Sequence, residues 1–270
     1  MKFYRSLKII IILCFFSFQI NAKDEVLRLA ITTTAENSGS NRFFLDAIIS
    51  SFNLILDIDA TLFNIVITSL KVSFTAVFIA SLIGIPLGII VALNEFGGKK
   101  LLMISLNTLM ALPTVVIGLI LYGILNRQGL LGDMALLYTP VAIIIGLCIL
   151  VIPIIWNLTI SAVSSTDPRL ANTCKSLGAT QTQRVFIYIS ETRFALITTI
   201  VTGFGRAIGE VGIAMMLGGN IQGFTRTMTT AIALETSKGA FEFALALGII
   251  LLFVAFFINI LLQYFQLKIR

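Results

Sequence analysis

The chain has 270 residues, of which 57% are hydrophobic and only 12% are charged, and its formal net charge is +6. This composition excludes an ordinary water-soluble globular protein. The chain has no histidine and no sequence of the form G-x-x-x-x-G-K-[ST]. It therefore lacks the commonest metal ligand and cannot hydrolyse ATP through a P-loop of its own. We expect no catalytic residue, no metal and no cofactor.

The first 22 residues have the pattern of a secretory signal. Three basic residues precede an apolar core, and Ala22 offers a small residue before polar sequence begins. We predict a signal peptide over residues 1–22, and the alternative is a retained signal anchor. Either form exports the residues that follow, so we expect an exported linker over 23–42.

This linker begins with strand-like alternation and continues into hydroxyl-rich sequence that includes Thr32, Thr33, Thr34 and Ser38. It resembles the mature start of periplasmic tungstate-binding proteins, in which such a cluster meets an oxyanion. The segment is too short to bury a core. We interpret it as a remnant of a binding protein joined to a membrane domain over 43–270. The alternative is an ordinary linker whose threonines are coincidental.

Five apolar segments follow, at 66–93, 101–125, 136–157, 194–217 and 242–266. Each supplies about 20 residues or more, which at about 1.5 Å per residue cross a hydrocarbon layer about 30 Å thick. Such segments must be helices, because lipid offers no partner to backbone polar groups. The sequence therefore predicts an all-α polytopic membrane protein with five transmembrane helices and lipid around them.

The basic residues between these segments indicate the orientation. One set of connections and the carboxyl-terminal tail hold Lys99, Lys100, Arg169, Lys175, Arg184, Arg193, Lys268 and Arg270. The opposite set holds only Arg127, Arg226 and Lys238. Because basic loops stay in the cytoplasm, we predict an exported amino-terminal region and a cytoplasmic carboxyl terminus. The same dispersal argues against nucleic-acid binding, which needs a continuous basic face.

We predict that residues 164–193 form a polar cytoplasmic loop. Asp167 precedes Pro168 as a helix cap would, and Gly178 permits a sharp turn before a second helical stretch. This loop resembles the coupling loop of ABC-importer permeases, although Asn172-Thr173-Cys174 stands where that family has Glu-Ala-Ala. The resemblance implies contact with an ATPase through Asp167, Asn172, Lys175, Leu177, Gly178 and Ala179.

A second stretch, 202–221, resembles the fourth span of oxyanion-importer permeases, and the tungstate branch most of all. Arg206 and Glu210 are four residues apart and are expected on one helix face. They either flank the translocation path, where Arg206 attracts an oxyanion, or form an ion pair that only holds the bundle together. Asn220 is a further candidate for the path or its entrance. Close helix packing is expected at Gly205, Gly209 and Gly212.

The resemblance covers residues 43–270 and implies the five-helix, MetI-like architecture of a dimeric ABC-importer permease in the bacterial inner membrane. The implied function is ATP-driven import of tungstate or a related oxyanion. Its expected partners are a cytoplasmic ATPase subunit, a periplasmic substrate-binding protein and a second copy of the permease. The alternatives are a permease for molybdate, sulfate or phosphate, and a non-transporting fusion product. A secondary transporter is disfavoured, because no inverted repeat is visible.

Overall fold

The structure, a computed structural model, describes residues 47–51, 53 and 60–268. The chain divides into two units, Met1–Asn53 and Leu54–Arg270. The expected signal segment 1–22 and linker 23–42 lie outside the described residues. The described residues of the first unit are helical, and all the elements that follow belong to the second unit.

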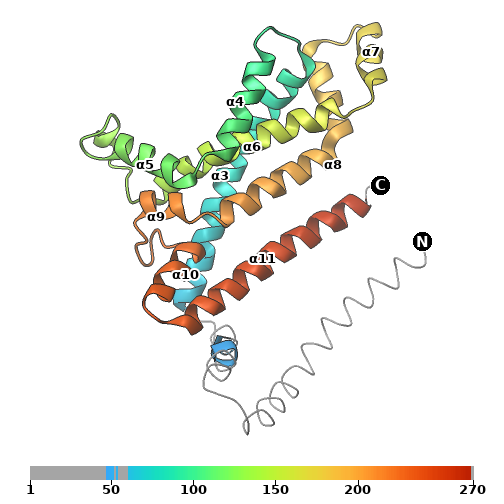
Figure 1. The fold of residues 1–270 in the computed structure, drawn as a ribbon. Helices are drawn as coiled ribbons and strands as arrows, with labels where there is room; N and C mark the ends of the chain where they lie inside the picture. The colour runs from blue at the N-terminus through green and yellow to red at the C-terminus, as the bar shows by residue number, and fades with distance from the viewer. Residues whose placement is uncertain (1–46, 52, 54–59, 269–270) are drawn as a thin grey trace, which may run out of the picture. The chain divides into compact units, whose positions relative to one another are not determined.

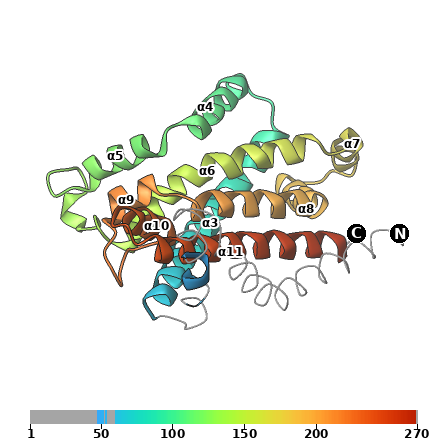
Figure 2. The same ribbon diagram turned by 60° about the horizontal axis from the view of Figure 1, so that its bottom comes forward.

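Regular structure in the described part of the second unit is entirely helical. In chain order the elements are α3 Ala60–Leu93, α4 Lys99–Ala111, α5 Thr114–Leu125, the 3₁₀ turn η2 Gly132–Met134, α6 Pro140–Ser164, α7 Pro168–Ser176, α8 Gln181–Ile208, α9 Gly212–Gly218, α10 Met228–Ser237 and α11 Phe241–Lys268. Helices α6, α8 and α11 run side by side, and α3 crosses them (Figures 1 and 2).

Four of these helices, α3, α6, α8 and α11, are long and apolar enough to cross a membrane. The pair α4–α5 makes a fifth span if it is counted as one, which matches the number expected from the sequence. The two helices of this pair meet at an angle of 94°, so the apolar run over 101–125 does not form one straight helix. The bend occurs at Pro113, which cannot donate a backbone hydrogen bond, and at Leu112, which has the extended conformation favoured before proline.

The core of the unit lies where α3 packs on α6. Gly84 and Gly88 of α3 bring the two backbones close together. A Cβ atom on Gly88 would lie 2.6 Å from the Cβ of Thr159 in α6, which is closer than real side chains pack. The buried apolar side chains of this core come from α3, α6, α8, α9, α10 and α11. Most of them are small or β-branched, among them Val72, Ala76, Ile143, Val151, Ala207 and Ala231.

Helix α8 differs from the expected arrangement at both ends. It begins at Gln181, inside the expected polar loop 164–193, because Thr180 and Gln183 form a reciprocal capping box there. It ends at Ile208, so the expected span 194–217 consists of the last part of α8, a break at 209–211 and the short helix α9.

Candidate functional site

The ion pair expected in the fourth span lies at the break between α8 and α9. Arg206 is in the last turn of α8, and its Nη1 atom donates to Oε2 of Glu210 over 2.7 Å. Glu210 lies beyond the end of the helix, so the two residues do not share a helix face as the spacing suggested. The Arg206 side chain is 40% exposed, whereas that of Glu210 is only 3% exposed.

Glu210 contacts three elements through different atoms. Its Oε1 accepts the backbone N–H of Ile213 in α9 over 3.2 Å, and its Oε2 accepts from Arg206 in α8. Its backbone carbonyl accepts the hydroxyl of Thr229 in α10 over 2.8 Å. Because the Oε1 contact satisfies the N–H of Ile213 in the first turn of α9, the Glu210 side chain helps the chain to start a new helix after α8 ends. Sequence reasoning did not predict the contact between Thr229 and Glu210, which are 19 positions apart.

Asn220, the third residue expected near the path, lies at the end of α9 with a left-handed backbone conformation (φ +53°). Its Nδ2 donates to the carbonyl of Thr230 over 3.3 Å. Within the described residues no hydrogen bond joins Asn220 to Arg206 or to Glu210. The structure therefore brings together two of the three expected residues and assigns Asn220 to a separate cluster.

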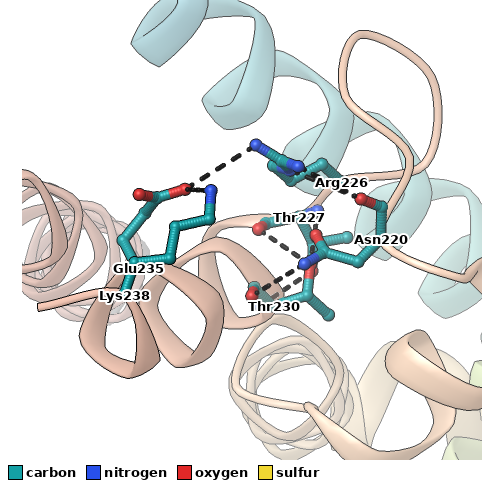
Figure 3. Close-up of polar contacts among 6 residues, drawn as sticks. All are labelled: Asn220, Arg226, Thr227, Thr230, Glu235 and Lys238. Atoms are coloured by element: carbon teal, nitrogen blue, oxygen red, sulfur yellow. Dashed lines mark hydrogen bonds and ion pairs between the residues drawn. The ribbon is translucent and has the colours of Figure 1, made fainter. Parts of the chain in front are cut away.

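That cluster holds the connection between α9 and α10 in place (Figure 3). Arg226 donates from Nε and Nη2 to the carbonyl of Asn220, each over 3.4 Å, and its Nη1 lies 3.9 Å from Oε1 of Glu235. Lys238 donates to the same Oε1 over 2.9 Å. Thr227 and Thr230 form a capping box at the start of α10. The sequence analysis did not identify the ion pair between Arg226 and Glu235. The two residues are nine positions apart, and this spacing leaves no periodic pattern in the sequence.

The predicted coupling residues lie at the opposite end of the helix bundle, where Figures 1 and 2 both show α7. Asp167 precedes α7, and its Oδ1 accepts the backbone N–H of Arg169 over 2.8 Å, as a helix cap does. Asn172 and Lys175 lie within α7. Gly178 has φ +68°, and the N–H of Ala179 donates to the carbonyl of Cys174 over 3.0 Å.

This six-to-one hydrogen bond and the left-handed glycine define a Schellman motif, which ends α7 and turns the chain into α8. Leu177 stands on the outside of the turn with 79% of its surface exposed. On the inner side, Leu170 of α7 packs against a buried cluster made by Ile89 of α3, Val163 of α6 and Tyr188 of α8. The elbow is thus in contact with the ends of three candidate spans.

The three glycines expected to serve helix packing differ in their surroundings. A Cβ on Gly212 would lie 3.1–3.3 Å from atoms of Val115, Thr114 and Glu210, which is a tight packing position between α5 and α9. A Cβ on Gly205 would meet nothing within 4 Å, and one on Gly209 would meet only the carbonyl of Gly205. Within the described residues, these two glycines leave the face of α8 beside Arg206 open.

These helices define a class of protein. The described part of the chain is an all-helical bundle of four or five apolar spans with a capped helical elbow at one end, which is the architecture of a polytopic membrane protein. The chain belongs to the family of binding-protein-dependent transport system inner membrane components, which it matches over residues 84–270. It is therefore a multi-pass inner-membrane subunit of an ABC importer, not an enzyme, and the family works with an ATPase and a substrate-binding protein.

Similar proteins include two tungstate uptake system permease proteins TupB. The one from Peptoclostridium acidaminophilum is 40% identical over 80% of this chain and 95% of its own length. The one from Campylobacter jejuni is 38% identical over 81% of this chain and 93% of its own length. Among solved structures, the MetNI methionine ABC transporter in an inward-facing conformation has a chain with a TM-score of 0.64 at 17% identity, covering 77% of this chain and 96% of that one. This last likeness concerns the fold alone.

Proposed function

We propose that this permease imports tungstate or a related oxyanion. The observation that carries the proposal is the half-exposed Arg206 at the break of α8, a cationic group inside an apolar span. A charge within the hydrocarbon zone is costly and usually serves function. Two relatives named as tungstate uptake permeases, at 40% and 38% identity over most of both chains, support tungstate as the first choice of substrate.

In this proposal the α7 end of the bundle faces the cytoplasm and the α9–α10 end faces outward. The charge distribution of the connections supports this orientation, which exports the amino-terminal region and leaves the carboxyl terminus inside. The binding protein then delivers substrate near α10. Large apolar side chains that point away from the bundle, such as Phe78, Leu82 and Leu252, contact lipid or a second copy of the chain in a homodimer.

The elbow formed by α7 and Gly178 is the proposed ATPase contact. Exposed Leu177 serves as an apolar knob for a cleft in the ATPase, and Asp167, Asn172, Lys175 and Ala179 belong to the same elbow. Because Leu170 packs on the ends of α3, α6 and α8, a displacement of α7 moves those helices as well. Coupling of this kind requires that the ATPase contacts differ between the two states of the transporter.

Uptake by the assembled transporter tests the proposal. The permease, its ATPase and its binding protein are reconstituted in proteoliposomes, and ATP-dependent accumulation of tungstate is measured at nanomolar supply. We expect accumulation that an excess of molybdate, sulfate or phosphate reduces to different degrees. Stronger transport of one of these competitors would reassign the substrate within the oxyanions.

A second candidate, a non-transporting product, is favoured by one observation only: Asn172-Thr173-Cys174 stands where related loops have Glu-Ala-Ala. No ATP-dependent accumulation of any oxyanion by a correctly assembled complex would favour this alternative and contradict the leading proposal.

A further inference from the structure

The two side chains of the Arg206–Glu210 pair differ in burial and in the number of hydrogen bonds they make. This difference bears on how an anion leaves the transporter. The carboxylate is buried and held on both oxygens, by Arg206 on Oε2 and by the Ile213 N–H on Oε1. The Thr229 hydroxyl holds the backbone of the same residue. With contacts to α8, α9 and α10, Glu210 cannot swing away without disturbing all three elements.

The guanidinium, by contrast, is engaged at one atom only. Nη1 is bound to Glu210, and within the described residues Arg206 makes no other hydrogen bond or ion pair. A guanidinium carries five N–H donors, so an edge remains that can bind an oxyanion through two parallel hydrogen bonds.

The surface beside Arg206 is open. Thr202 and Gly205 are exposed on one side of α8, and Gly209, just beyond the end of the helix, is exposed as well. The space that a Cβ on Gly205 would occupy has no atom within 4 Å. Part of the guanidinium can therefore be reached from outside this chain.

We propose that Glu210 is a positioning and charge-balancing residue that keeps the oxyanion site at Arg206 weak. The carboxylate directs the free edge of the guanidinium to the open face and cancels much of its charge. A transport site must bind its ion well enough to admit it and weakly enough to release it. An unbalanced arginine within an apolar span would hold a divalent anion instead of passing it on. This inference rests on the proposed function, because it assumes that an oxyanion passes Arg206.

The variant Glu210→Gln tests this inference, because glutamine keeps the size of the side chain and one acceptor oxygen but removes the charge. We expect equilibrium binding of tungstate to the purified permease–ATPase complex, without binding protein, to tighten by about tenfold or more. In proteoliposomes both KM and kcat for tungstate uptake are expected to fall. A purely architectural ion pair would not produce this combination, since its loss lowers thermal stability without creating anion affinity.

The chain offers a matched control in Glu95, which forms an ion pair with Lys99 at the same spacing and 2.8 Å but is exposed to solvent. Glu95→Gln is expected to leave tungstate binding and uptake unchanged. The double variant Arg206→Gln/Glu210→Gln is expected to lose the gained affinity, because the guanidinium that binds the anion is gone.

A second pair of variants leaves Glu210 untouched and keeps the inference testable if Glu210→Gln does not assemble. Thr202 is exposed one turn before Arg206, so Thr202→Lys adds positive charge to the same face. We expect tighter tungstate binding and slower uptake for Thr202→Lys than for Thr202→Gln, which adds a long side chain at the same position without the charge.

Three results would overturn the inference about Glu210, and one of them would also overturn the proposed function. Wild-type uptake of tungstate together with unchanged or weaker binding in folded Glu210→Gln overturns the inference and leaves the proposed function standing. Unchanged binding in Thr202→Lys does the same where Glu210→Gln cannot be purified. Absence of oxyanion uptake by the wild-type complex overturns both.

Discussion

At the scale of single residues, glycines separate the tight contacts of the bundle from its open faces. Gly88 and Gly146 sit where a Cβ would collide with neighbouring side chains of another helix. Gly205 and Gly248 lie in helices as well, but a Cβ on either would meet nothing within 4 Å. The packing predicted at Gly205 from its spacing to Gly209 has no partner within the described residues of this chain, and packing of these glycines against a second copy stays a prediction.

These surroundings predict opposite effects for the same substitution. Gly88→Ala forces a methyl group against Thr159 and is expected to destabilise the protein by about 1–3 kcal/mol. Gly248→Ala in α11 adds a methyl group in open space and is expected to be neutral or slightly stabilising, because alanine favours a helix over glycine. Thermal unfolding of the detergent-purified permease checks both. Equal melting temperatures for the two variants would contradict the close contact between α3 and α6.

At the scale of elements, the break between α8 and α9 and the elbow between α7 and α8 are the two places where chain direction changes near functional residues. Each has a local cause. Glu210 caps α9 at the break, and the left-handed Gly178 ends α7 at the elbow. The sequence identified Gly178 as a turn from its residue type, whereas the capping role of Glu210 depends on the break itself.

Two substitutions of Gly178 in the elbow are expected to reduce uptake to different degrees. Gly178→Pro sets φ near −65° where the structure has +68°, so the Schellman turn cannot form. We expect tungstate uptake to be lost while the protein still inserts into the membrane. Gly178→Ala can adopt the left-handed conformation at a cost of roughly 1–2 kcal/mol, so an intermediate effect is expected.

Two readouts serve this test: tungstate uptake in proteoliposomes, and pull-down of the ATPase by the tagged permease. Both are expected to decline from wild type through Gly178→Ala to Gly178→Pro. If the Gly178→Pro permease pulls down as much ATPase as the wild type, this elbow is not the docking site of the ATPase.

At the scale of the whole molecule, the described helices of the second unit have two chemically different ends joined by apolar helices. The α7 end carries the elbow, and the α9–α10 end carries the cluster of Arg226, Glu235 and Lys238 (Figures 1 and 3). The proposed import direction requires that the α7 end lies in the cytoplasm.

Cysteine labelling with a membrane-impermeant reagent tests this orientation. The native Cys174 is unsuitable, because its side chain is only 3% exposed. Leu177→Cys replaces an exposed residue three positions away, and we expect it to react in inverted vesicles but not in intact spheroplasts. Leu130→Cys, at a loop position 92% exposed between α5 and α6, is the matched control and should react in spheroplasts. The reverse labelling pattern would reject the importer orientation.

The sequence by itself determined the class of protein, the number of apolar segments and the proximity of Arg206 to Glu210. These features depend on composition and on neighbours within one turn of chain, which a linear pattern contains. Only the tertiary structure decided the burial of Glu210 against Thr229 and the open face at Gly205. These depend on how helices cross one another, and apolar surfaces pack in many registers without leaving a distinct mark on the sequence.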